Sequence, residues 1–156
     1  MRGRGCWGAG WLPVLRDLVA EFPFLELRAP AAPSDLTAIE ARLGTRLPDA
    51  LRALLSESDG LEGEYGEGVV WPAARILEDN RMFRSHPDFP ELYESFDPLL
   101  FFGDNGGGDQ FAFVRTPERD DVFVWDHETD ERNRVVGSLG EYVRRALSSG
   151  GGDWYR

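Results

Sequence analysis

The amino-acid sequence predicts a single domain of the α+β class. Its 156 residues suffice for one domain with a buried core, and a hydrophobic content of 42% excludes a disordered chain. Segments with the spacing of amphipathic helices come first along the chain. Three short segments in which aromatic residues alternate with others follow, and a capped helix comes last. Helices and strands are therefore expected together in one domain.

A helical extension, residues 1–33, is expected before the domain. The stretch RAPAAPS, residues 28–34, is a linker because its prolines block a helix. At the other end SSGGGDWYR, residues 148–156, is predicted to be a flexible tail, which leaves residues 34–147 for the domain. The helix of the extension is expected within residues 11–27, where apolar side chains recur near helical spacing at Trp11, Leu15, Leu18, Val19 and Phe22.

Two short helices are predicted next, as a helical hairpin. Ser34 is the expected N-cap of the first helix, which ends at Gly44. Pro48 begins the second, in the first turn where its missing N–H is not needed, and Gly60 ends it. The apolar faces of the two helices comprise Leu36, Ile39, Leu43, Leu51, Leu54 and Leu55.

The second half of the domain is predicted to hold the sheet. A polar loop, EGEYGEG at residues 62–68, precedes it, and the proline-rich residues 85–98 predict another loop with at most one helical turn near Leu92 and Tyr93. Ser138 and Glu141 form a capping box for the last helix. The other predicted elements are a short strand VVWP at residues 69–72, a helix at 73–84, and strands at 99–102, 110–115 and 122–126.

The stretch FFGDNGGGDQFAFV, residues 101–114, raises the question of a phosphate site. Phosphate-binding glycine loops need a helix directly after the glycines, because its N–H groups and its dipole bind the anion. Here the glycines lie between two predicted strands, no Lys-Ser/Thr pair follows, and Asp104 and Asp109 would repel an anion. The glycines therefore predict a strand-joining turn, in which at least one of residues 106–108 takes a positive φ.

The net charge is strongly negative and uneven. The chain has 28 acidic residues against 17 basic ones, all arginine, and residues 57–109 alone hold 13 acids and three arginines. Such a field repels nucleic acid and anionic membranes and attracts a basic partner, although solubility alone also favours acidic surfaces. No apolar run approaches the roughly 20 residues of a membrane helix. We expect a cytoplasmic protein that binds neither nucleic acid nor membrane.

Residues able to hold a metal or act as nucleophiles are sparse. The single cysteine, Cys6, forms no internal disulfide, and with only two histidines in the chain a Cys/His zinc site cannot be assembled. The stretch WDHETDE begins like an EF-hand loop, but Glu131 stands where that loop needs glycine and Gly137 where it needs glutamate. His127 is interpreted as a turn histidine. The sequence predicts no metal, no cofactor and no enzyme.

Five motifs follow in order: IEARLGTRLPDALRALLSESDG, VVWPAARILEDN, LLFFGDNGGGDQFAFV, VFVWDHETDE and VVGSLGEYVRRAL. Together they resemble the SMI1/KNR4, or SUKH, superfamily. The pattern of that superfamily has an E-x-x-LG…LP hairpin ending in DG or NG, an FG…GGD turn, a V-x-x-WDHE strand and a final S-[FL]-x-E-[FY]. The resemblance covers about Ser34 to Leu147. It implies one α+β domain with a mostly antiparallel sheet flanked by helices.

The resemblance also implies a function. Most bacterial members are similar to immunity proteins of polymorphic or contact-dependent toxin systems, which bind a cognate toxin, often a nuclease, and block it. The acidic charge agrees, because a nuclease domain is typically basic. We expect a non-catalytic protein that neutralises a basic toxin domain. The alternative is a regulatory interaction adaptor without a toxin, like the fungal branch that acts in cell-wall synthesis and signalling.

The expected partner-binding residues lie in the polar loop and in the glycine turn. Tyr65 is the candidate anchor, because an aromatic ring in an acidic, glycine-rich loop has little to pack on, although a ring folded back on the domain is an equal alternative. A hydrolase is the third function class, but it would need paired acids about 5 to 9 Å apart. The acids assigned to the partner surface are Glu62, Glu64, Glu67, Asp104 and Asp109.

Overall fold

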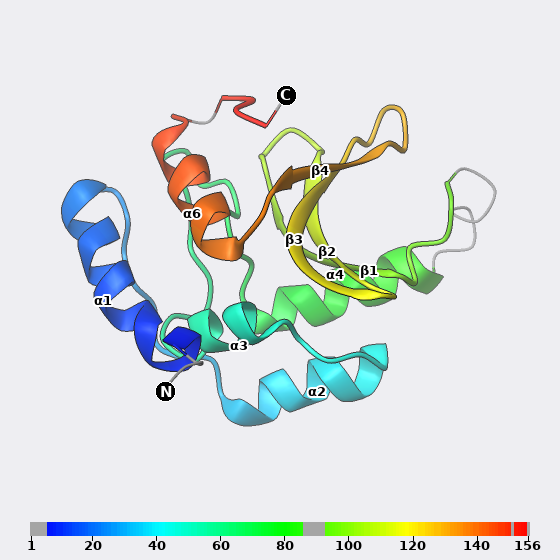
Figure 1. Ribbon diagram of the computed structural model, residues 1–156, viewed down its shortest axis with the longest axis horizontal. Helices are drawn as coiled ribbons and strands as arrows, with labels where there is room; N and C mark the ends of the chain where they lie inside the picture. The colour runs from blue at the N-terminus through cyan, green and yellow to red at the C-terminus, as the bar shows by residue number, and fades with distance from the viewer. Residues whose placement is uncertain (1–5, 86–92, 151, 156) are drawn as a thin grey trace.

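Four antiparallel strands and the helices around them make up the computed structural model, which describes residues 6–85, 93–150 and 152–155 (Figure 1). In chain order the elements are α1 (Cys6–Glu21), α2 (Pro33–Leu43), α3 (Asp49–Leu55), α4 (Ala73–Ser85), β1 (Leu99–Asp104), β2 (Gln110–Arg115), β3 (Glu118–Trp125), β4 (Arg132–Val136) and α6 (Leu139–Ser148). The α+β class is confirmed. The expected helical turn near Leu92 falls largely outside the described residues.

The sheet is a meander with the strand order β1-β2-β3-β4. The predicted antiparallel pairing of residues 110–115 with 122–126 is confirmed, with Phe111 opposite Val124. β3 begins earlier than predicted, because the chain turns tightly at Thr116 and Pro117 and the exposed residues that follow still pair with β2. The sequence did not predict β4, whose first three residues are polar and carry no apolar alternation.

The predicted end of α2 agrees with the structure, but its predicted first residue does not. Gly44 ends α2 in the left-handed conformation, with a φ of 68°, as predicted. Ser34 is not the N-cap of α2: Ala32 takes that place and Pro33 begins the helix, where its missing N–H needs no partner. The stretch VVWP does not form a separate strand, since only an isolated bridge joins Leu61 to Val70.

Aromatic side chains fill both faces of the sheet. On the face toward α6, Phe102 stacks on Phe113 with centroids 4.7 Å apart, and Tyr142 of α6 lies 5.1 Å from Phe102. On the face toward α4, a second cluster joins Phe83, Phe96, Phe101 and Trp125 at centroid distances between 4.9 and 6.0 Å. The alternation of strand side chains thus divides one aromatic-rich segment between two halves of the core.

The N-terminal extension contributes to this core. Trp11, Leu15 and Leu18 are at most 1% exposed, and α1 packs against α3. An exposed ion pair between Glu21 and Arg144 also links α1 to α6. No helix among the described residues is both long and apolar enough to cross a membrane.

The outer edge of β1 is covered by side chains of α4. The amide of Asn80 accepts a hydrogen bond from the Phe101 N–H at 2.8 Å and donates one to the Phe101 carbonyl at 2.8 Å. Arg84 donates to the carbonyl of Leu99 at 2.8 Å. Asn80 is 1% exposed, so its amide replaces the strand that an open sheet edge would otherwise pair with.

We expect Asn80→Ala to lower the free energy of unfolding by about 3 kcal/mol, because it leaves two buried backbone groups of Phe101 without partners. Urea denaturation followed by circular dichroism measures this change. Glu78→Ala, at an exposed position of the same helix, is the control and should change the stability by no more than about 0.5 kcal/mol. Equal effects of the two substitutions would contradict the edge-covering role of Asn80.

Candidate functional site

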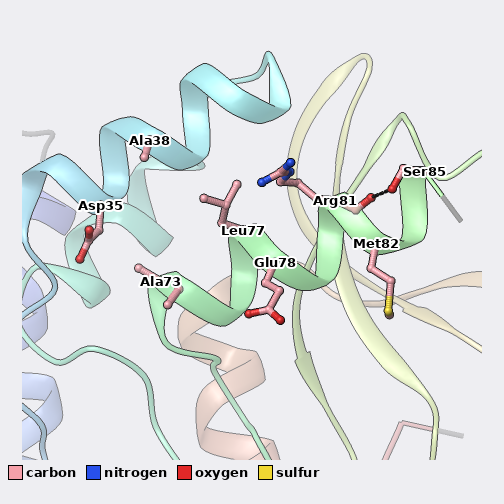
Figure 2. A pocket seen from close by; sticks show the side chains of 9 residues that line it. Asp35, Ala38, Ala73, Leu77, Glu78, Arg81, Met82 and Ser85 are labelled. Carbon is pink, nitrogen blue, oxygen red and sulfur yellow. Dashed lines mark hydrogen bonds between the residues drawn. The ribbon is translucent and has the colours of Figure 1, made fainter.

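A groove of about 560 Å³ lies between α2 and α4 (Figure 2). Its floor is apolar, with Leu77 and alanine side chains, and Met82 on its rim is 46% exposed. Asp35, Glu78 and Arg81 add charges of both signs around it. None of the residues that the sequence assigned to a partner surface lies in this groove, so the candidate site is elsewhere.

The glycine turn between β1 and β2 has the predicted conformation. Gly106 and Gly108 have φ values of 84° and 111°, a region that favours glycine. The imidazole of His127, in the turn after β3, adds a second constraint. A Cβ atom on Gly108 would lie 2.8 Å from Cε1 of His127, closer than real contacts allow. Gly108 is therefore required both by the backbone and by the imidazole packed against it.

Asp104 joins the polar loop to the glycine turn. Its Oδ1 accepts hydrogen bonds from the N–H groups of Gly68 at 3.0 Å and Gly106 at 3.2 Å. Its Oδ2 accepts from the Trp71 indole at 3.2 Å and from Arg75 at 2.9 Å. The Arg75 guanidinium also lies 4.3 Å from the centroid of the Trp71 ring. With only 15% of its side chain exposed, Asp104 acts mainly within the fold.

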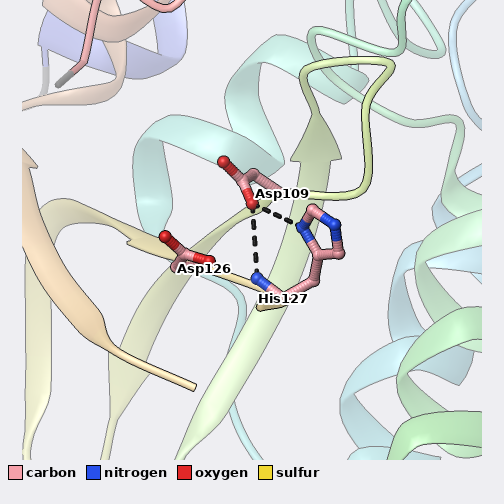
Figure 3. A group of neighbouring side chains, drawn as sticks. All are labelled: Asp109, Asp126 and His127. Carbon is pink, nitrogen blue, oxygen red and sulfur yellow. Dashed lines mark hydrogen bonds and ion pairs between the residues drawn. The ribbon is translucent and has the colours of Figure 1, made fainter. Parts of the chain in front are cut away.

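Asp109, at the other end of the turn, is buried (Figure 3). Its Oδ1 lies 2.7 Å from Nδ1 of His127 and accepts the His127 N–H at 3.3 Å. Its Oδ2 accepts the hydroxyl of Tyr155 at 2.8 Å. The carboxylate therefore ties the turn after β3 and the C-terminal residues to the glycine turn.

Asp109, Asp126 and His127 are the residues best placed to hold a metal, because one ligand atom of each lies within 4.8 Å of the others. Two ligands of a tetrahedral zinc ion, each about 2.0 Å from the metal, are roughly 3.3 Å apart. The 2.7 Å between Asp109 Oδ1 and His127 Nδ1 is instead the length of a charge-assisted hydrogen bond. Asp126 also accepts a hydrogen bond from the Glu128 N–H. The arrangement fits a proton between Asp109 and His127 better than an ion.

The polar loop, residues 62–68, projects from the domain. Tyr65 is 73% exposed, and Glu64 beside it is exposed as well. Glu67 bends back, since its Oε1 accepts the Tyr65 N–H at 3.0 Å, and Glu62 pairs with Arg28 at 3.1 Å. Shallow depressions of about 410 and 360 Å³ lie on the two sides of the loop. The ring of Tyr65 does not fold back on the domain.

The loop is held firmly at its base. The hydroxyl of the fully buried Tyr142 donates to the carbonyl of Val69 at 2.6 Å. Burial raises the pKa of Tyr142 well above its ordinary value, and the nearby carboxylates of Asp104 and Glu67 raise it further. The raised pKa favours the protonated hydroxyl, which is the form that donates to Val69.

The structure divides the predicted partner residues into two groups. Glu62, Glu64, Tyr65 and Glu67 lie together on the projecting loop. Asp104 lines the depression of about 410 Å³ beside Tyr65 and Glu67, with 15% of its side chain exposed, whereas Asp109 is buried. The assignment of these two acids to a partner surface stays a prediction. Both carboxylates point toward hydrogen-bond donors of the fold, because a buried charge needs such donors to replace water.

Sequence reasoning missed several residues that shape this region. Tyr155 and Trp154 lie against the glycine turn and β2 rather than apart from the domain, and Arg28 of the expected linker pairs with the loop. Their partners are far along the chain, so no local pattern marks them. The aromatic pair at the end of a glycine-rich tail was the one available signal.

We expect Gly108→Ala to lower the free energy of unfolding by about 2 kcal/mol, through backbone strain and the contact with His127. Gly107→Ala is the matched control: the atoms nearest to its added Cβ, in Asn105, are 3.6 Å away, and Gly107 has no positive φ. Thermal and urea denaturation of both variants measure the difference. If Gly107→Ala were the more damaging change, our account of the turn would be wrong.

Comparison with known proteins supports the assignment of the fold. The model of the SMI1 / KNR4 family (SUKH-1) matches residues 30–145, well over half of the chain. No curated protein matches the chain at significant similarity. The family match runs from the segment before α2 into α6 and therefore includes the polar loop, the glycine turn and the whole sheet. The chain belongs to the SMI1/KNR4 family.

Proposed function

We propose that this protein is a non-catalytic binding protein that neutralises a basic toxin domain, as an immunity protein does. The observation that carries the proposal is the projecting loop, in which Tyr65, the most exposed large apolar side chain among the described residues, lies near Glu62, Glu64 and Glu67 in sequence. An exposed aromatic ring among like charges is typical of a contact residue in an interface. Family membership is consistent with this role.

The arrangement of the loop suits fast and specific binding. The loop is anchored by Tyr142 and Asp104, whereas Glu64 and Tyr65 at its tip are exposed, so the tip can vary in sequence without loss of the core. Negative charge at the tip attracts a basic surface over a distance set by the ionic strength. A basic nuclease covered by this loop would lose access to its phosphate substrate.

The buried acids offer little support for catalysis. Asp104 and Asp109 are the acids that the glycine turn brings closest to the core, and donors from Gly68, Arg75 and Tyr155 engage their oxygens. A general acid or base instead needs an oxygen or nitrogen atom that can reach a substrate.

A regulatory adaptor would use the same loop. The identity of the bound partner separates it from an immunity protein.

The first test is to purify the protein from its own cells with bound chains and to identify them. We expect a basic toxin domain, whose activity falls when the protein is added at equal concentration. A secreted protein with a variable C-terminal domain encoded next to this gene would agree. Recovery of a signalling or cell-wall protein without toxin activity would favour the adaptor instead.

We expect the triple variant Glu62/Glu64/Glu67→Gln to bind this partner at least about tenfold more slowly at low salt, because long-range attraction acts on the association rate. Glutamine keeps the acceptor oxygen with which Glu67 holds Tyr65. Surface plasmon resonance at two salt concentrations measures the rate. The salt dependence of the wild type should be steeper than that of the variant.

A matched control removes three exposed acids elsewhere, in the variant Asp35→Asn, Glu118→Gln, Asp120→Asn. Glu118 and Asp120 belong to the first residues of β3, and Glu118 pairs with Arg115 at the end of β2 that is far from the glycine turn. This control should leave the association rate within about twofold. An equal loss in both variants would show that total charge, and not this loop, drives association.

We expect Tyr65→Ala to act on the dissociation rate and to weaken the complex by about 1–3 kcal/mol, because a central aromatic anchor is desolvated on binding. Met82→Ala removes another exposed apolar side chain, at the groove between α2 and α4, and serves as the control. A larger effect of Met82→Ala in the same dissociation measurement would move the interface to that groove.

A further inference from the structure

The C-terminal residues lie in a groove beside the projecting loop. This groove is formed by the glycine turn, β2 and α6, and its lining includes Glu67, Asn105, Phe111 and Ala146. Trp154 forms one wall of the space that remains there, which is only about 10 Å³, so the C-terminal residues nearly fill the groove. The groove therefore brings together an acidic rim, an aromatic wall and a polar end.

Trp154 and Tyr155 use different parts of the groove. The Trp154 ring stacks on Phe111, with a centroid distance of 5.9 Å and an interplanar angle of 15°, and lies 5.8 Å from Tyr142. The Tyr155 ring meets Phe111 edge-on at 5.1 Å. Its hydroxyl donates to Asp109 Oδ2 at 2.8 Å and accepts from Asn105 Nδ2 at 2.6 Å. The groove thus recognises two adjacent aromatic rings and one phenolic hydroxyl.

The segment that occupies the groove is less buried than the core and is joined to α6 by glycines. Both aromatic side chains remain partly exposed, unlike the core rings beneath them. The sequence Ser-Ser-Gly-Gly-Gly-Asp joins them to α6, and glycines permit the backbone many conformations. The family match ends at residue 145, before this segment begins. The groove walls belong to the family domain, whereas the occupant does not.

We propose that this groove is a binding site for a peptide segment with two adjacent aromatic residues, and that the Trp154–Tyr155 pair of this chain occupies it as an internal competitor. A partner segment of the same chemistry enters when the tail leaves. Because Glu67 lines the groove and also holds the Tyr65 loop, a partner can contact the loop and the groove at once. The tail then raises the partner concentration that is needed for binding at this second contact.

The internal competitor gives a simple expectation. A short flexible linker holds the tail at an effective concentration in the millimolar range. An added peptide must compete with it in the wild type but not in a full-length chain whose own tail cannot bind. Loss of the Tyr155 hydroxyl removes a hydrogen bond to a buried carboxylate, which weakens binding about tenfold or more.

The test uses the synthetic peptide SSGGGDWYR, identical to residues 148–156, and the full-length double variant Trp154→Ala/Tyr155→Ala. Nuclear magnetic resonance titration follows the backbone amide signals of residues 105–108. We expect saturable shifts in the double variant and an apparent Kd at least about tenfold higher in the wild type. A peptide with phenylalanine in place of the tyrosine should bind the variant about tenfold more weakly.

A peptide with alanine at both aromatic positions is the control and should cause no shifts. Equal titrations of wild type and double variant, or no binding to a folded double variant, would overturn the proposal. Unfolding of the double variant, seen in its amide spectrum, would also overturn it, because the tail would then be part of the core.

The single variant Tyr155→Phe gives a second test. Amide hydrogen exchange at residues 105–108 should become about tenfold faster, and unchanged exchange would count against the site.

Discussion

The structure depends on how the open edge of β1 is covered. β1 is an outer strand of the sheet, so its backbone groups on that side need partners other than a strand. The Asn80 amide hydrogen-bonds to the N–H and carbonyl of Phe101, and Arg84 donates to the carbonyl of Leu99. Two further groups are bonded by the end of the polar loop and the segment after it, since the Trp71 N–H donates to the Phe102 carbonyl and the Gly68 carbonyl accepts from the Asp104 N–H. Covering one sheet edge therefore fixes α4 and the projecting loop at the same time.

This arrangement gives the acidic residues of the region two different roles. Carboxylates next to the edge, such as Asp104, replace lost water with hydrogen bonds from backbone and side chains, and they hold the loop and the glycine turn together. Carboxylates at the loop tip, such as Glu64, remain in water and supply the electric field. The same negative composition thus contributes both a rigid base and an attractive surface, which a binding protein with a variable contact loop requires.

The chain also extends its family domain at both ends. α1 fills the core beside α3, whereas the C-terminal aromatic pair lies on the surface and reaches Asp109 through Tyr155. The first contact is apolar and extensive, so it stabilises the fold. The second consists of two half-buried rings and a few hydrogen bonds, which is an amount of contact that a competing segment can replace.

The sequence by itself determined the features that depend on neighbours along the chain. These are the apolar stripes of the helices, the left-handed end of α2 at Gly44, a positive φ within residues 106–108, and the antiparallel pair of aromatic strands. Only the tertiary structure decided that β4 forms, that Asp104 and Asp109 turn inward, and that Tyr155 lies on the glycine turn. One partner of Asp104, Gly68, is 36 residues away, and one partner of Asp109, Tyr155, is 46 residues away. The polar residues of β4 form a strand because β3 offers them an edge. Burial and hydrogen bonding between such distant groups have no periodicity in sequence, so they arise only when the chain has folded.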